Sequence, residues 1–193
     1  LLASMDVGIA LFMEIHLKRF GITLYLNTEA SSFTGKDLKV ETPNGEKKIA
    51  AEKIIVAVGR MPNSDQLGLD LGMISTDRFG LIHTQKDCRI TEHVAAIGDL
   101  TKGPALAHKA SAEGIIAAEA LCGLKVSFQP AAIPSVVFSD PEIASAGLTE
   151  KGAQTRGIQV RVSKFPVSSS GRAKTLGLKS GFLQIISDIE DDI

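Results

Sequence analysis

Apolar residues near the start of the chain recur at the spacing of a helix. Val7, Leu11 and Ile15 fall on one helical face. Asp6 is a residue type that caps helix N-termini, and Gly21 is one that ends helices. The pattern therefore predicts a helix over residues 7–20.

Shorter apolar runs follow this helix and predict strands. The run Ile54–Val58 is unbroken and apolar, which is typical of a strand buried on both faces. Pro43-Asn44-Gly45 is a turn signal. Together these runs indicate the later part of an α/β unit with an antiparallel addition. The strands expected here cover residues 22–26, 30–33, 38–42 and 54–58.

The character of the pattern changes after Gly59. Residues 61–80 are rich in turns, and a helix with many small side chains is expected over 105–121. Beyond Pro130 and Pro134 the pattern is that of an α+β region. The remaining expected elements are strands at 81–84, 94–97, 135–138, 143–146, 159–165 and 182–187, a short helix at 150–156 and a turn over 187–192.

The most informative stretch is the strand–loop–helix step over residues 94–110. Asp99 follows a short apolar strand and Gly98, and a helix begins near Ala105. A carboxylate at a strand end can accept hydrogen bonds from sugar or polyol hydroxyls, and the free amides of a helix N-terminus favour an anionic group. Gly98 allows a ligand to lie against the backbone. The alternative is an ordinary strand–loop–helix unit with an aspartate on its surface.

Composition narrows the class of protein. The chain has 193 residues, 44% of them hydrophobic and 22% charged, and a net charge of -1. This balance is typical of a soluble domain, so we expect a cytoplasmic protein without a nucleic-acid or membrane partner. The chain starts without a methionine and ends near an apolar strand, 182–186, that an intact domain would cover. Both features lead us to expect a chain cut at both ends.

The two cysteines do not indicate disulfide or metal chemistry. Cys88 and Cys122 lie 34 positions apart, which is not a metal-type spacing. We expect each to be a small, buried, apolar residue. No metal site is expected.

Four ordered segments of the chain, 54–63, 96–110, 138–150 and 165–175, are informative together. They resemble the flavoprotein disulfide oxidoreductases, closest to the branch that oxidises dihydrolipoamide. Mercuric reductases and soluble pyridine nucleotide transhydrogenases share these segments. The resemblance implies α/β parts of the NAD- and FAD-binding Rossmann-like domains, followed by an α+β dimerisation domain. It places the NAD-binding part at 1–58, the second FAD-binding segment at 59–130 and the dimerisation domain at 131–193.

The resemblance also implies two cofactors, FAD and NAD. Asp99 would hold the ribityl chain of FAD, and the backbone of Ala105, Leu106, Ala107 and His108 would face the flavin ring. Gly59 would lie against the ribose and nicotinamide side of NAD, and the backbone of Ala30 against adenine. No catalytic residue is assigned, because the chain contains neither the family's C-x-x-x-x-C pair nor its histidine–glutamate pair. None of its 18 glycines has another glycine two positions away, so the G-x-G-x-x-G fingerprint of dinucleotide binding is also missing.

The implied activity is electron transfer between a dithiol or disulfide and NAD through flavin. The implied partners are a second copy of the chain and, in a longer parent protein, a 2-oxo acid dehydrogenase complex. The missing fingerprints and thiols leave an alternative open. In that alternative the chain is a non-catalytic module that dimerises and binds a nucleotide.

Overall fold

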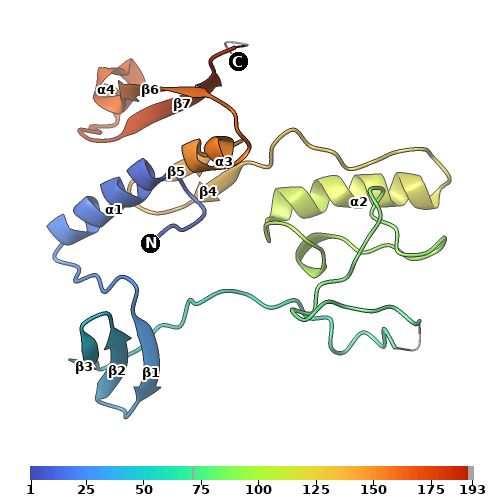
Figure 1. Ribbon diagram of the computed structural model, residues 1–193, viewed down its shortest axis with the longest axis horizontal. Coiled ribbons are helices and arrows are strands. Elements are labelled where there is room, and N and C mark those ends of the chain that lie inside the picture. The colour runs from blue at the N-terminus through green and yellow to red at the C-terminus, as the bar shows by residue number, and fades with distance from the viewer. Residues whose placement is uncertain (71, 191–193) are drawn as a thin grey trace. The chain divides into compact units, whose positions relative to one another are not determined.

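The computed structural model describes residues 1–70 and 72–190 (Figure 1). The chain divides into two compact units. One unit combines residues 1–56 with 138–193, and the other comprises residues 57–137. The boundary therefore falls inside the apolar run 54–58.

The first unit begins with helix α1, Val7–Arg19, and a three-stranded sheet. The Asp6 side chain accepts a hydrogen bond from the Gly8 amide, which confirms the expected cap. The antiparallel sheet has the order β1-β2-β3. Its strands are β1 (Glu29–Phe33), β2 (Asp37–Thr42) and β3 (Gly45–Ala50). The sequence pattern predicted β1 and β2 but not β3, whose residues are mostly polar and exposed.

The later part of this unit contains a two-stranded hairpin. Strands β6 and β7 pair antiparallel, from Val160 opposite Asp188 to Pro166 opposite Phe182. Phe182 meets Phe12 of α1 edge-on, with ring centroids 5.7 Å apart. The elements are β5 (Ile143–Ser145), α3 (Glu150–Thr155), β6 (Val160–Pro166), the 3-10 turn η2 (Val167–Ser169), α4 (Gly171–Thr175) and β7 (Phe182–Asp188). All four strands and the short helix predicted beyond residue 134 are present, each within two residues of its expected ends.

The second unit is built around helix α2, Ala107–Leu121. The 3-10 turn η1, Gly98–Leu100, packs against it, and β4, Ser135–Val137, ends the unit. Small and medium apolar side chains form its core, namely Ile82, Cys88, Ala96, Ala117 and Ala120. The helix predicted over 105–121 is confirmed, with its first turn beginning two residues later.

Four of the predicted strands are wrong. Residues 22–26 and 54–58 have no strand structure, and 81–84 and 94–97 form only isolated bridges, such as Ile82 with Thr101. Ile55 and Val58 are each 93% exposed. A strand exists only when a neighbour accepts its backbone hydrogen bonds, and the described residues place no strand beside the run 54–58. Apolar character alone therefore did not produce a buried strand.

The expected fold class was α/β followed by α+β, and the sheets of the described residues show which strand pairings are present. The structure mixes helices and strands, and both β1–β3 and β6–β7 are antiparallel. Parallel pairing appears as the isolated bridge between Ile82 and Thr101. Of the turn predicted at 187–192, residues 187 and 188 belong instead to β7, residues 189 and 190 form a turn as predicted, and the last two lie outside the described part of the chain.

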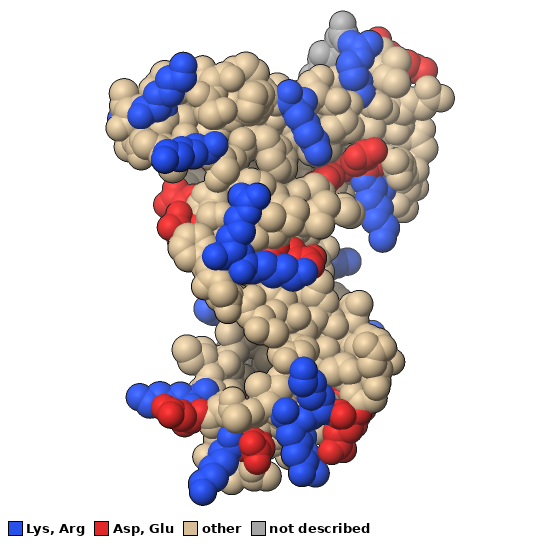
Figure 2. Space-filling view, turned by 90° about the vertical axis from the view of Figure 1, so that its left-hand side faces the viewer, with Lys and Arg blue, Asp and Glu red and all other residues tan. Residues whose placement is uncertain are grey.

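Charged side chains of both signs share the face of the protein drawn in Figure 2. On the face drawn in Figure 2, lysines and arginines are interspersed with acidic residues. The total of 21 basic and 22 acidic residues agrees with this view. Among the described residues, no helix combines the length and apolar character that a membrane crossing requires.

Candidate functional site

The turn at Gly98 and Asp99 packs directly against the first turn of α2. Gly98 has φ 69, a left-handed conformation that favours glycine. A Cβ at Gly98 would lie 3.1 Å from the Cβ of Ala110, which is closer than ordinary side-chain contact. Gly98 therefore allows η1, which contains Asp99, to pack closely on the first turn of α2.

The Asp99 carboxylate is accessible. Its Oδ2 accepts a hydrogen bond from Nη1 of Arg60 at 3.2 Å, and the two side chains are 40% and 74% exposed. Ion pairs this exposed contribute about 0–1 kcal/mol, because water screens them and two long side chains must be ordered. A ligand hydroxyl can therefore compete with Arg60 for this carboxylate. The sequence pattern singled out Asp99 but did not indicate its pairing with Arg60.

The start of α2 offers backbone amides. Leu106 is the N-cap residue and provides no side-chain hydrogen bond to the helix. Ala105 and Ala107 are exposed. Nε2 of His108 lies 2.8 Å from the carbonyl oxygen of Pro134, so this imidazole contacts the segment that leads into β4. Because its imidazole is engaged with Pro134, His108 can offer its backbone to a ligand at this helix start.

The two residues proposed for NAD lie in different units. Gly59 precedes Arg60, has φ 135 and is exposed, with no atom within 4 Å of the position its Cβ would take. Ala30 lies in β1 of the first unit, opposite Val40 and next to an irregularity in the strand register. The second unit therefore contains Asp99, residues 105–108 and Gly59, whereas Ala30 belongs to the first.

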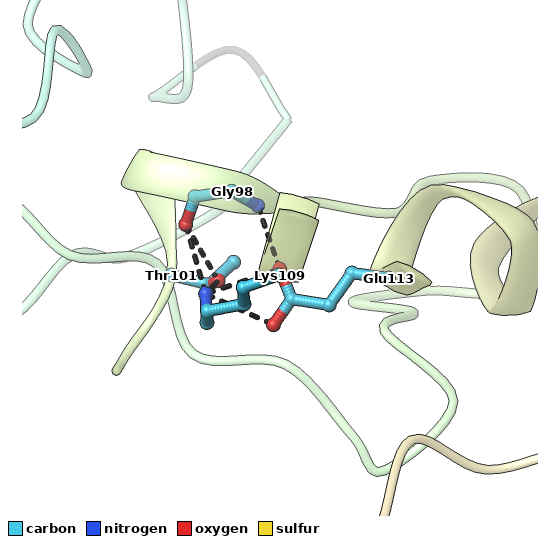
Figure 3. Close-up of polar contacts among 4 residues, drawn as sticks. All are labelled: Gly98, Thr101, Lys109 and Glu113. Carbon is cyan, nitrogen blue, oxygen red and sulfur yellow. Dashed lines mark hydrogen bonds and ion pairs between the residues drawn. The ribbon is translucent and has the colours of Figure 1, made fainter. Parts of the chain in front are cut away.

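The sequence analysis missed a buried ionic network around Gly98, the residue that precedes Asp99 (Figure 3). Lys109 and Glu113 are 2% and 5% exposed and form an ion pair of 3.0 Å. Both hydrogen-bond the backbone of Gly98, and Lys109 also donates to the Thr101 hydroxyl. Opposite charges four residues apart on a helix were the available signal, but such pairs usually lie on the solvated face.

The two cysteines have different surroundings. Cys88 is buried, as expected, and burial raises the pKa of its thiol, with the nearby Glu113 and Asp87 carboxylates acting in the same direction. Cys122 is exposed, which corrects the expectation that it is buried. It is the C-cap residue of α2. Among the described residues, no cluster of three or more histidine, cysteine or acidic side chains could hold a metal ion.

Each unit also contains a cavity that the sequence did not reveal. In the second unit, a cavity of about 240 Å³ is lined by Thr101, Lys109, Glu113 and Cys88, and not by Asp99. In the first unit, a cavity of about 1040 Å³ is lined by Asp6, Phe12 and residues between Ser139 and Asp188. Asp99 and residues 105–108 thus line neither of these two cavities.

Comparison with known protein families gives two matches. Residues 1–114 match the family described as "Pyridine nucleotide-disulphide oxidoreductase". Residues 133–193 match the family described as "Pyridine nucleotide-disulphide oxidoreductase, dimerisation domain". The two matches cover the N-terminal and C-terminal parts of the chain in that order.

Curated relatives and solved structures agree with these matches. The chain is 41% identical to dihydrolipoyl dehydrogenase of Geobacillus stearothermophilus over all of its own length and 42% of that protein. It is 44% identical to dihydrolipoyl dehydrogenase of Bacillus subtilis over 82% of its length and 34% of that protein. LpdA of Mycobacterium tuberculosis matches the structure with a TM-score of 0.82 at 27% identity, over 95% of this chain and 40% of LpdA. The chain thus spans about two fifths of the length of these relatives.

Proposed function

The chain belongs to the pyridine nucleotide-disulphide oxidoreductase family, and on this basis we propose that it supplies part of the FAD and NAD sites of a dithiol oxidoreductase. The proposed reaction is electron transfer between a dithiol, with dihydrolipoamide the first candidate, and NAD. The similarity to two dihydrolipoyl dehydrogenases supports this choice of substrate. The observation that carries the proposal is the position of Asp99 directly after Gly98, whose backbone packs against Ala110 in the first turn of α2.

The residues at this position fit the chemistry of FAD. The ribityl chain of FAD carries hydroxyls, and the accessible Asp99 carboxylate can accept hydrogen bonds from them. The amides of Ala105, Ala107 and His108 can donate to the flavin ring, because no side chain of the N-cap residue occupies the helix start. The Leu106 amide donates to the Pro104 carbonyl oxygen, so Leu106 is proposed to face the ring with its backbone and not as a donor. When bound, FAD supplies the two-electron carrier between thiols and nicotinamide. The helix start then favours negative charge on the ring.

NAD contacts are proposed for Gly59 and Ala30. At Gly59 the backbone has no side chain over it and is exposed, so a ribose or nicotinamide group can lie against it. The backbone of Ala30, at the irregular part of β1, is proposed to contact adenine. We assign the NAD-binding part to residues 1–58, the second FAD-binding segment to 59–130 and the dimerisation domain to 131–193.

The proposed partner is a second copy of the chain, because residues 133–193 match a dimerisation domain. In the complete protein, docking to a 2-oxo acid dehydrogenase complex is proposed by analogy with the dihydrolipoamide-oxidising branch. The alternative function is a non-catalytic nucleotide-binding module that dimerises. One observation favours it: the two cysteines are free, one buried and one exposed, and so provide no redox dithiol in the described residues.

Substitution of Asp99 tests the proposed FAD site. In the protein expressed from its natural gene, Asp99→Ala is expected to weaken FAD binding by roughly ten- to a hundredfold, since a hydrogen bond to a charged group contributes about 1.5–3 kcal/mol. FAD affinity is measured by titrating the apoprotein and following flavin fluorescence. Asp65→Ala, at an exposed aspartate of the same unit, is the control. Equal FAD affinity in the Asp99 variant and the wild type would reject the site.

The flavin content of the protein separates the two candidate functions. An oxidoreductase purified from the natural gene is expected to be yellow, with flavin in defined stoichiometry, and to reduce NAD with dihydrolipoamide. A colourless preparation that dimerises and binds nucleotide without turnover would favour the non-catalytic module.

A further inference from the structure

The ionic pair Lys109–Glu113 is buried, unlike most helical pairs of this spacing. The two residues lie one turn apart in α2 and have almost no exposed surface. Removing two charges from water is costly, and apolar side chains of similar size commonly stabilise a fold equally well. Helix packing alone therefore does not explain why this position carries charges.

The pair hydrogen-bonds both the amide and the carbonyl group of Gly98 (Figure 3). Oε2 of Glu113 accepts a hydrogen bond from the Gly98 amide at 2.7 Å, and Nζ of Lys109 donates to the Gly98 carbonyl oxygen at 3.1 Å. The Thr101 hydroxyl accepts from Lys109 at 3.1 Å and donates to the same carbonyl at 3.0 Å. Both polar backbone groups of Gly98 are thus bonded to buried side chains.

The Gly98 carbonyl belongs to the peptide bond that leads into Asp99. Fixing this peptide plane limits the directions in which the Asp99 side chain can leave the backbone. The Gly98 carbonyl also accepts a hydrogen bond from the Thr101 backbone amide, which closes η1. The side-chain bonds add to this restraint on a residue whose left-handed conformation and missing side chain leave its backbone flexible. The network therefore restrains the flexible residue that precedes the carboxylate.

Another glycine makes room for the network. A Cβ at Gly103 would lie 2.8 Å from Cε of Lys109. The loop between η1 and α2 thus approaches the lysine stem as closely as a backbone without a side chain allows. The buried position of the ammonium group depends on this loop as well as on α2.

We propose that Lys109, together with Glu113 and Thr101, is a positioning residue that fixes the Gly98 peptide and so directs the Asp99 carboxylate toward the ribityl hydroxyls of FAD. This inference rests on the proposed FAD site. It adds three residues that do not themselves touch the cofactor. It also gives the buried charges a role that a close-packed apolar pair could not perform, because apolar side chains cannot bond both backbone groups of Gly98.

A double-mutant cycle tests whether the network acts through Asp99. Thr101→Val keeps the shape of the side chain and removes its hydroxyl, and Lys109→Met keeps the stem and removes the ammonium group. In the protein from its natural gene, each is expected to weaken FAD binding by about tenfold, as for loss of one hydrogen bond to a charged group. In the Asp99→Ala background the same changes are expected to alter FAD affinity by less than about twofold, because coupled residues are not additive.

Controls separate positioning from loss of fold. Thr101→Ser retains the hydroxyl and is expected to bind FAD like the wild type. Lys125→Met removes an exposed lysine just beyond α2 and is expected to have no effect. Circular dichroism verifies the folding of each variant. If Lys109→Met does not fold, the cycle is measured with Thr101→Val and Asp99→Ala. In the wild-type protein, hydrogen exchange is expected to show a protected Gly98 amide.

The outcomes distinguish the inference from the proposed function. If Asp99→Ala weakens FAD binding and both Thr101→Val and Lys109→Met bind like the wild type, the positioning role is rejected and the FAD site stands. Additive losses in the cycle, or rapid exchange of the Gly98 amide, also reject the positioning role alone. If Asp99→Ala binds FAD like the wild type, the FAD site and the positioning role fail together.

Discussion

At the scale of single residues, the two cysteines differ in how far their side chains are buried. Cys88 lies in the core of the second unit, its amide bonded to the Gln85 carbonyl and its own carbonyl bonded to the Ala96 amide. Burial and the neighbouring carboxylates raise the pKa of its thiol, so little reactive thiolate is present near neutral pH. Cys122 is exposed at the end of α2.

This difference predicts selective alkylation. In the folded protein at about pH 8, iodoacetamide is expected to label Cys122 at least about tenfold faster than Cys88, because only thiolate that the reagent can reach reacts. Mass spectrometry of peptides from timed samples measures both rates, and labelling in denaturant provides the control in which both react. Faster labelling of Cys88 than of Cys122 in the folded protein would contradict the assigned burial.

At the scale of elements, one carboxylate joins two helices that are distant in the sequence. Oδ1 of Asp6 accepts from the Gly8 amide at the start of α1, and Oδ2 accepts from the Glu150 amide at the start of α3, each at 3.1 Å. Burial acts to raise the pKa of this carboxyl, but hydrogen bonds from Gly8, Glu150 and Gln184 and the charge of Lys164 outweigh it. The pKa of Asp6 is therefore lowered.

Loss of this double cap is expected to destabilise the first unit. Asp6→Ala should lower the free energy of unfolding by about 1–2 kcal/mol at neutral pH, the usual range for removing an N-cap. Since the folded pKa lies below 3.8, the contribution of Asp6 is complete above that pH and is lost as the pH falls through the folded pKa.

Urea unfolding followed by circular dichroism at several pH values measures this difference. The gap between wild type and Asp6→Ala is expected to be constant at neutral pH and to close in acid. Glu52→Ala, at an exposed carboxylate of the same unit, should show no such gap. A gap that widens as the pH falls would contradict the role of the carboxylate.

At the scale of the whole molecule, the β6–β7 hairpin presents an apolar face to solvent. Leu183, Ile185 and Phe165 are exposed on adjacent strands, with Leu183 directly opposite Phe165. This hairpin lies in the part of the chain that matches a dimerisation domain. Contiguous exposed apolar side chains of this kind mark surfaces that another segment covers, either a second copy of the chain or further residues of a longer protein. The match to a dimerisation domain favours the second copy.

A charged side chain on this face of the β6–β7 hairpin is expected to weaken the proposed dimer. Burying one leucine side chain contributes about 1.5–3 kcal/mol, and a symmetric interface contains each residue twice, so Leu183→Glu is expected to weaken dimerisation by at least about tenfold. Leu176→Glu is the matched control, because Leu176 and Leu183 are both 56% exposed and Leu176 lies outside the hairpin. Analytical ultracentrifugation measures both. Equal dimerisation of the two variants would show that this face is not the interface.

Much of the local structure followed from the sequence, because it depends on near neighbours. Helical spacing and the Asp6 cap predicted α1, and the apolar run at 182–186 predicted β7. The run 54–58 failed for the opposite reason, since a strand needs partners that its own residues cannot supply. In the candidate site, the sequence indicated Asp99 and the start of α2, but it did not indicate Arg60 as the ion-pair partner of Asp99.

By itself the sequence determined the family and the order of Gly98, Asp99 and the helix that follows, because motifs and helical periods are properties of consecutive residues. Only the tertiary structure decided which charges are buried. The spacing of Lys109 and Glu113 is the same for a solvated pair and a buried one, and packing of η1 on α2 excludes water from this pair. Likewise, no local pattern links Asp6 to Glu150, because folding alone brings residues so far apart in the chain within hydrogen-bond distance.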